Sequence, residues 1–168
     1  MENSKKYSFA LVICVGFVAG LFIKLFVLDI LHVSGRSMEP SVRDGAVLFV
    51  NKLAFGIVEP YGDKLLVKWG NPERDDIVIY LYDNKIVVKR CVAVAGDKIE
   101  YSTDPIYTLT VADKTIPLSE SQFNNMKASH VVPDDYILAI GDNYAESIDS
   151  RTYGFVSEKN ILGKVICK

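Results

Sequence analysis

A short hydroxyl-rich stretch follows a long apolar run near the start of the chain. It reads SGRSMEPSVRDG over residues 34–45, and two of its serines, Ser34 and Ser37, stand three residues apart among glycine and proline residues. A serine hydroxyl becomes a useful nucleophile only when a neighbouring base removes its proton. The glycines and the proline predict a turn that presents one of these serines, so the next residue to identify is the base.

The candidate bases are the two histidines and the lysines. His32 stands at the end of the apolar run, and His130 stands in the polar stretch ASHVVPDD, so a Ser-His-Asp triad with His130 stays open. Lys89 is the better candidate, because it is flanked by apolar residues in IVVKRCVAVAG and burial lowers the pKa of an amine. The alternative is an ordinary strand lysine that faces solvent. Arg90 points to the opposite face of the predicted strand and stays protonated.

A third polar stretch, GDNYAESIDSRTYGFV, covers residues 141–156 and follows a predicted strand. Such loops at strand ends often carry function. Asp149 and Arg151 could form an ion pair with each other or with Arg90, and Ser147 could hold a lysine amine in position. The chain has no H-E-x-x-H, no C-x-x-C and no zinc-type His/Cys spacing, so no zinc site is indicated.

The elements that must position these residues are mostly strands. From about residue 32, short segments rich in Val, Ile and Tyr alternate with Gly, Asp, Asn and Pro, which is typical of β-structure. The predicted strands lie in AVLFVNK, DIVIYLY, KIVVKRCVAVAG, DKIEY, YTLTVADKTIPL, DYILAIGD and ILGKVIC. The second and third form a predicted hairpin with Asp83 and Asn84 at its turn, and residues 119–128 are a loop or a short helix. We therefore expect residues 32–168 to form one mostly antiparallel β domain, with a small insertion over about 100–131.

An uncharged apolar run from Tyr7 to Ile23 precedes this domain, with Lys5 and Lys6 before it. Lys24 interrupts this run, but its long side chain can reach the membrane–water interface. Residues 7–28 together are therefore long enough to form one transmembrane helix. The two lysines favour a cytoplasmic location for residues 1–6, which would place the β domain on the far side of the membrane. A cleavable signal peptide is the alternative, although no clear small-x-small site follows the run. A buried core helix is a further alternative, with little to pack against.

Charge and cysteine content add few constraints. The net charge of the 168 residues is −2 and no long basic run is present, so no nucleic-acid partner is indicated. The cysteines are Cys14, Cys91 and Cys167. Because Cys14 lies in the apolar run, at most the other two could pair, and all three could be free thiols.

The three polar stretches together resemble those of bacterial type I signal peptidases, also called leader peptidases. In that family the nucleophilic serine is followed by Met, any residue and Pro, as in SMEP here. The base lysine is followed by Arg and then by GD, as in KRCVAVAGD, and the last box reads GDN, a short gap and S-x-DSR, as in GDNYAESIDSR. The resemblance covers most of the chain, including the apolar run. It implies a serine endopeptidase that needs no metal or cofactor and is anchored in the cytoplasmic (inner) membrane, with its catalytic domain on the extracytoplasmic side.

The resemblance also implies roles for individual residues. Ser37 attacks the scissile carbonyl, its backbone N–H donates to the oxyanion, and a neutral Lys89 takes the hydroxyl proton to give an acyl-enzyme. Ser147 hydrogen-bonds the Lys89 amine and orients it. Charged residues that brace the site are Asp142, Asp149, Arg151 and Arg90. Departures from the family pattern are Ser41 in place of Thr, Ala95 in place of Pro, and Gly35 where some members carry a hydroxyl, which leaves the second oxyanion donor open.

The family prefers small residues such as Ala at the first and third positions before the cut, and we expect the substrate to bind as an added strand. The expected pocket residues are Val33, Met38, Val42 and Val88. The implied partners are preproteins with Ala-x-Ala-type sites, the lipid bilayer and the secretion machinery.

Other functions stay open. Self-cleaving repressors of the DNA-damage response share a Ser-Lys dyad and a related β fold, but they are soluble and carry a DNA-binding domain. A specialised peptidase that matures one pilin or conjugation substrate would use the same dyad. A membrane-anchored binding domain that no longer cleaves would be signalled by loss of Ser37 or Lys89, and both are present.

Overall fold

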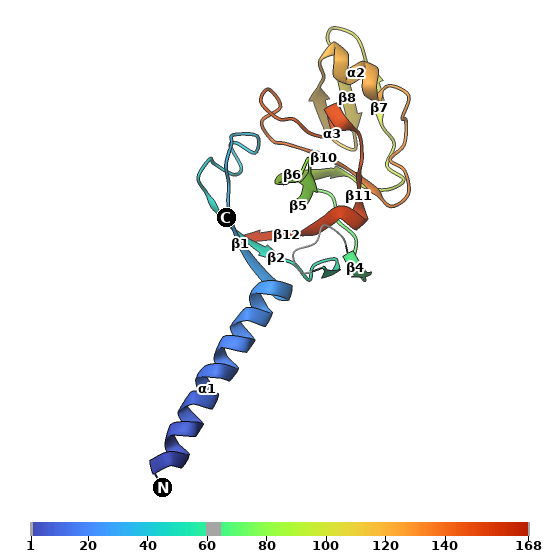
Figure 1. The fold of residues 1–168 in the computed structure, drawn as a ribbon. Helices are drawn as coiled ribbons and strands as arrows, with labels where there is room; N and C mark the ends of the chain where they lie inside the picture. Colours follow the sequence, from blue (N-terminus) through green and yellow to red (C-terminus); the bar gives the residue numbers. More distant parts are fainter. Residues whose placement is uncertain (1, 60–64, 168) are drawn as a thin grey trace.

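The structure is a computed structural model that describes residues 2–59 and 65–167, and within the first helix it describes the side chains of residue 9 and of residues 11 onward. The elements in chain order are α1 (Glu2–Phe22), a π-helical turn (Ile23–Val27), β1 (Leu28–His32), β2 (Val47–Asn51), β3 (Gly56–Val58), β4 (Leu65–Lys68), β5 (Ile77–Tyr82), β6 (Lys85–Ala93), β7 (Glu100–Ser102), β8 (Thr108–Val111), β9 (Lys114–Pro117), α2 (Glu120–Met126), β10 (Tyr136–Ile140), α3 (Ser150–Tyr153), β11 (Val156–Ser157), a 3₁₀ turn (Glu158–Asn160) and β12 (Ile161–Cys167). Figure 1 shows α1 projecting away from a β-rich body.

The main sheet has seven strands in the order β1-β2-β12-β5-β6-β10-β11, and its described pairings are antiparallel. This confirms the mostly antiparallel β domain predicted from the sequence. The predicted hairpin of β5 and β6 is also confirmed, with Asp83 and Asn84 at its turn in the left-handed region (φ 49° and 57°), which Asp and Asn tolerate better than most residues. Successive residues of β5 enter different apolar clusters, Val78 and Tyr80 in one and Ile79 in another, so both faces of the sheet are covered.

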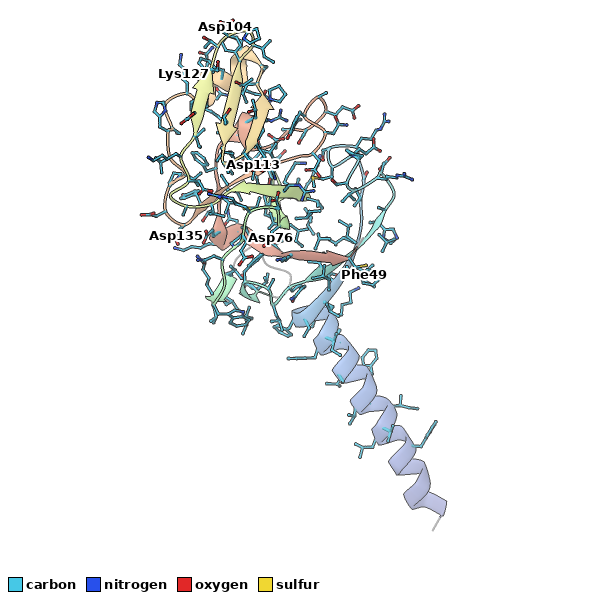
Figure 2. All side chains as sticks on the ribbon, turned by 180° about the vertical axis from the view of Figure 1, so that it is seen from behind. Phe49, Asp76, Asp104, Asp113, Lys127 and Asp135 are labelled. Carbon is cyan, nitrogen blue, oxygen red and sulfur yellow. The ribbon has the colours of Figure 1, made fainter. Side chains whose placement is uncertain are left out.

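A separate three-stranded sheet, β7-β8-β9, covers most of the segment in which we expected an insertion. With α2 it forms the distal lobe, at the end of the molecule opposite α1 (Figures 1 and 2), where Figure 2 labels Asp104 and Lys127. Residues 119–128, expected to be a loop or a short helix, contain α2. The helix begins after a capping box in which Ser119 and Gln122 satisfy each other's backbone N–H groups.

The apolar run forms a helix: α1 ends at Phe22, and the π-helical turn Ile23–Val27 continues it to the residue before the expected boundary at residue 28. Leu28 already begins β1, which pairs with β2 from Leu28–Asn51 to His32–Val47. Strand pairing competes with continuation of the helix here, and the β-branched Ile30 favours extended backbone. Within the described part of the chain, no helix is both long and apolar enough to cross a membrane. Residue 1 and the side chains of residues 2–6, for which we expected a cytoplasmic location, lie outside the described part.

Candidate active site

Ser37 lies in a loop between β1 and β2 that is closed at its base by backbone hydrogen bonds. The Val33 N–H donates to the Ala46 carbonyl at 2.9 Å, and the Gly45 N–H donates to the Val33 carbonyl at 3.0 Å. Gly35 and Gly45 have φ values of 110° and 77°, which glycine adopts at little cost. The turn predicted from the glycines and the proline is therefore present, and it holds a half-buried Ser37 just beyond β1.

Lys89 extends from β6 to Ser37. Its Nζ lies 2.7 Å from the Ser37 Oγ, which is hydrogen-bond distance. The residue is only 4% exposed, so it is not a strand lysine that faces solvent. Burial lowers the pKa of its amine; Asp149 and Asp142 oppose this shift, and Arg151 adds to it. An amine whose pKa is lowered in this way can act as a base toward the serine hydroxyl.

Neither histidine takes this position. His130 is exposed, and its ring lies edge-on to Tyr101 with the ring centroids 5.8 Å apart, next to the distal lobe. His32 stands at the end of β1 and lines the cleft beside the serine. Among the described residues, the side chain within hydrogen-bond distance of the Ser37 hydroxyl is Lys89, so the geometry favours lysine over the Ser-His-Asp alternative.

Asp149 and Arg151 form a buried ion pair behind these two residues. The Arg151 Nε and Nη2 donate to the two carboxylate oxygens of Asp149, both at 2.9 Å, and the side chains are 1% and 0% exposed. Asp149 also accepts from the Gly141 N–H at 3.0 Å. Arg151 also donates to the carbonyls of Tyr144 at 3.0 Å and Ser147 at 3.3 Å. Of the two pairings expected for these residues, the structure forms the one between Asp149 and Arg151, and that pair fixes the loop after β10.

Arg90 pairs with Asp142. The Arg90 Nε and Nη2 lie 2.8 Å and 2.6 Å from the two oxygens of the Asp142 carboxylate. Burial alone raises the pKa of Asp142, but the hydrogen bonds from Arg90 and Ser41 outweigh it and hold this pKa below its usual range. Arg90 Nη2 also donates to the Ser41 Oγ at 3.2 Å, so the hydroxyl that replaces the family's usual Thr keeps a polar contact to the site.

The loop after β10 also contacts the Ser37 loop directly. The Asn143 N–H donates to the Ser37 carbonyl at 3.0 Å, and its Nδ2 donates to the Arg36 carbonyl at 3.1 Å. Gly141 approaches so closely that a Cβ there would lie 2.5 Å from the Ser37 carbonyl oxygen and 2.2 Å from the Ser147 Oγ. We assigned no role to Gly141 or Asn143 from the sequence, although both stand in the GDN stretch, because their function depends on two loops that are distant in sequence.

The hydrogen bond expected between Ser147 and the Lys89 amine is not formed. Ser147 is 6% exposed, and within the described residues its Oγ has no hydrogen-bond partner. A buried hydroxyl without a partner costs free energy. The orienting role of Ser147 therefore stays a prediction, while its proximity to Gly141 places it next to the Ser37 loop.

A cleft of about 300 Å³ opens beside Ser37 and Lys89. Three of the four expected pocket residues line it, namely Val33, Met38 and Val88. Val42 does not line the cleft, because the chain turns after Met38. The Val42 N–H donates to the Met38 carbonyl at 2.8 Å, and Val42 lies in a buried apolar cluster.

The two cysteines that could have paired do not form a disulfide. Cys91 is buried and Cys167 is exposed, and both are free thiols.

An antiparallel β domain that holds a serine hydroxyl against a buried lysine has the groups of a serine hydrolase in which lysine replaces histidine as the base. The sequence comparisons agree with this class. The family model described as "Signal peptidase, peptidase S26" matches residues 4–168. The chain belongs to this signal peptidase family and is a serine peptidase, as the three motifs predicted.

Individual relatives show the extent of the similarity. The chain is 29% identical over 177 aligned residues to signal peptidase IB of Staphylococcus aureus (strain Mu50 / ATCC 700699), with 91% of this chain and 83% of that protein covered. It is 23% identical over 217 aligned residues to signal peptidase I of Buchnera aphidicola subsp. Baizongia pistaciae (strain Bp), with coverages of 86% and 70%. The crystal structure of a signal peptidase I from Enterococcus faecalis V583 aligns with a TM-score of 0.43 at 26% identity, over 58% of this chain and 98% of that one.

Proposed function

We propose that this protein removes N-terminal signal peptides from exported preproteins at Ala-x-Ala-type sites, with Ser37 as nucleophile and Lys89 as general base. The observation that carries the proposal is the 2.7 Å contact between the Ser37 Oγ and the buried Lys89 Nζ. Two further observations support it. Relatives of the chain are named signal peptidases, and the cleft beside the dyad has apolar side chains, among them Val33, Met38 and Val88, in its wall.

In the proposed reaction, neutral Lys89 takes the proton of the Ser37 hydroxyl as the Oγ attacks the scissile carbonyl carbon. The Lys89 ammonium then gives this proton to the leaving amine, the C–N bond breaks, and an ester acyl-enzyme remains on Ser37. A water molecule loses a proton to Lys89 and attacks the ester, and the proton returns to Ser37 as the new carboxyl end is released. The backbone N–H of Ser37 serves as one donor to the oxyanion.

The same proposal includes attachment of the domain to a lipid bilayer through α1. Large apolar side chains of this helix are exposed, for example Phe9 at 69% and Phe17 at 72%, and hydrocarbon is a better environment for them than water. Because α1 leads through one turn into β1, and β1 into the Ser37 loop, attachment through α1 keeps the active site near the membrane surface. We place the catalytic domain on the extracytoplasmic side of the cytoplasmic membrane, where cleavage sites emerge. The secretion machinery remains a predicted partner.

The test is cleavage of a model preprotein with an Ala-x-Ala site by the purified full-length protein in detergent. We expect the wild type to cut after the second Ala, and Ser37→Ala to reduce kcat/KM at least about 10³-fold. N-terminal sequencing of the product identifies the bond. Ser102→Ala, in an exposed serine of the distal lobe, is the matched control and should keep full activity. A wild type that cuts no Ala-x-Ala substrate would contradict the proposal and favour a specialised peptidase or a binding domain.

The rate is expected to rise with pH through the pKa of Lys89. Only the neutral amine can accept the serine proton, and burial lowers this pKa below its ordinary value. Activity should therefore be present above the lowered pKa and be lost as the pH falls through it. The measurement is kcat/KM for a signal-peptide substrate over about pH 5 to about pH 10. A profile that stays flat or falls with rising pH would assign the base to another group.

Val88→Ala is expected to widen the proposed pocket. Val88 lines the cleft and also packs beside a buried cluster that contains Ile79 and Leu162. Removing two methyl groups should raise the ratio of kcat/KM for a substrate with Leu before the cut to that for one with Ala, by about tenfold. Val67→Ala, at an exposed valine of β4, is the control. An unchanged ratio in a folded Val88→Ala protein would remove Val88 from the pocket.

A further inference from the structure

A small recess lies next to the active-site cleft, and we call it the polar recess. Its volume is about 280 Å³, and the reaction proposed above gives it no role. Its lining comes from the Ser37 loop, from β6 and β9, and from β10 with the loop after it. The side chains that matter for its function are Ser41, Arg90, Lys114 and Asp142.

The polar recess continues the cleft along β6. Ile86 and Val88 line the cleft, and Arg90 lines the recess. The pairing of β6 with β5 is regular from Lys85 to Arg90, so these three side chains, each two residues from the next, point to one face of the strand. Ile140 of β10, the cross-strand partner of Arg90, extends the recess sideways. Cleft and recess therefore lie end to end on one face of the sheet.

The dyad stands where the two spaces meet. Ser37 and Lys89 line the cleft, whereas Ser41 and Arg90, a few residues further along the same two segments, line the recess. Gly141 also lines the recess, and it is the residue whose Cβ would lie 2.5 Å from the Ser37 carbonyl oxygen. A peptide that holds its scissile bond at the dyad, with the residues before the cut in the cleft, therefore continues into the recess with the residues after the cut.

The strand geometry sets how many substrate residues the recess can contact. Arg90 follows Lys89 by one residue and Val92 by three, which corresponds to about 3 Å and about 10 Å at about 3.3 Å per residue. An extended peptide that runs along β6 has the same rise. Its first, second and third residues after the scissile bond therefore lie at the polar recess.

The charges that line the polar recess do not balance. Among its described lining residues, the two cations Arg90 and Lys114 accompany one carboxylate, that of Asp142. Arg90 is already engaged, because its Nε and Nη2 both donate to Asp142. The charge of Lys114 is felt inside the recess: burial raises the pKa of Asp142, Arg90 and Ser41 lower it, and Lys114 adds to the lowering. Lys114 is therefore the cation that is available to a ligand.

The present partner of Lys114 can be replaced or supplemented. The Nζ pairs with Asp75, whose side chain is 64% exposed and does not line the recess. An ion pair with so exposed a partner contributes little to stability, and an ammonium has three N–H donors. A carboxylate that enters the recess can therefore bind Lys114 at little cost. Figure 2 labels Asp113, the residue before Lys114, at the end of the distal lobe nearer to the main sheet.

We propose that the polar recess binds the first residues after the scissile bond, and that Lys114 selects an acidic side chain among them. This inference rests on the proposed function and adds a specificity determinant on the other side of the cut. The small-residue pockets choose the bond, and Lys114 favours preproteins whose mature part begins with an Asp or Glu near its end. The distal lobe, which supplies Lys114 from β9, thereby becomes part of the substrate site.

The experiment uses synthetic peptides that share one Ala-x-Ala site and differ at one position after the scissile bond. Glu, Gln or Lys is placed in turn at the first, second or third position. At one of these positions we expect the wild type to have a kcat/KM about three- to fivefold higher with Glu than with Gln, and lower with Lys than with Gln. High salt should reduce this advantage, because it screens a partly exposed ion pair.

Lys114→Glu is the informative variant, because it reverses the charge that the inference assigns to the site. It should prefer Lys over Glu at the same position. Lys127→Glu makes the same change of charge on an exposed lysine at the far end of the distal lobe (Figure 2) and should keep the wild-type preference.

Asp75→Asn tests the same contact from the other side if Lys114→Glu does not fold. It removes the carboxylate that competes for Lys114, so the advantage of the Glu peptide should increase about twofold or more. Asn suits this position, because Asp75 has a φ of 72°, which Asn tolerates better than most residues.

Three results would overturn the inference. They are equal rates with Glu and Gln at all three positions in the wild type, a Glu preference that persists in Lys114→Glu, and a reversal that Lys127→Glu produces equally, which would assign the effect to net charge. If the wild type cuts no peptide, the proposed function fails by itself. Direct binding of labelled peptides to the same proteins then decides the inference, since Glu must still tighten binding about three- to fivefold in the wild type and weaken it in Lys114→Glu.

Discussion

Lys89→Met is expected to abolish signal-peptide cleavage, with kcat reduced about 10³-fold or more, while the protein folds as stably as the wild type. The methionine fills the volume of the lysine stem, but it cannot take the serine proton from 2.7 Å away. Stability should be retained or increased, because the change removes a buried amine whose charged form is disfavoured by desolvation. Single-turnover cleavage and thermal unfolding of the same preparations measure both effects.

Two controls make this result specific. Lys85→Met changes an exposed lysine at the start of the same strand and should leave kcat unchanged. His130→Ala should also be active, because His130 lies against Tyr101 rather than at the serine. Activity that survives Lys89→Met but disappears in His130→Ala would show that the nucleophile is assigned correctly and its base is not.

Gly141→Ala is expected to reduce kcat at least about 100-fold with a smaller change in KM. A methyl group at this position would lie 2.2 Å from the Ser147 Oγ and 2.5 Å from the Ser37 carbonyl oxygen, both closer than real contacts allow. One of these neighbours is backbone, so the loop that carries the nucleophile must move. Displacement of a reacting group by about 1 Å is enough for a loss of this size. Overpacking should also lower the free energy of unfolding by about 1–3 kcal/mol.

Gly16→Ala is the matched control for this change. A Cβ at Gly16 meets no atom within 4 Å, and an alanine in a helix is favoured over glycine. The variant should therefore be fully active. Wild-type kcat in Gly141→Ala would mean that the two loops can separate without effect on the chemistry, and the close approach would then have no catalytic role.

The chemistry of the site was more predictable than its geometry. Ser37 and Lys89 could be chosen from short motifs and from the apolar surroundings of one lysine, because nucleophile and base impose strict demands on residue type. The contacts that position them could not. Gly141 and Asn143 act on the Ser37 loop across more than a hundred residues of sequence, and no local pattern records that packing. Val42 was assigned to the pocket by analogy with the family, but the backbone turn after Met38 directs it into the core.

The fold shows the same division between local and distant information. The hairpin of β5 and β6 was predictable, because alternating apolar residues flank a two-residue turn of Asp and Asn. The pair β3 and β4 was missed, since three- and four-residue strands carry too few residues to show a period. The start of β1 was missed because its apolar residues continue the composition of the helical run, and only pairing with β2 distinguishes them.

The junction of α1 with β1 has a mechanical consequence. The π-helical turn joins them directly, and Lys52 makes two hydrogen bonds to this turn. Its Nζ donates to the Leu25 carbonyl at 2.7 Å, and its backbone N–H donates to the Val27 carbonyl at 2.9 Å. Helix, turn and first strand therefore follow one another without a gap and lead into the loop that carries Ser37. A change in the tilt of α1, or a rotation about its axis, must carry Ser37 with it. If α1 is attached to a membrane as we propose, this backbone geometry sets the distance of Ser37 from the membrane surface.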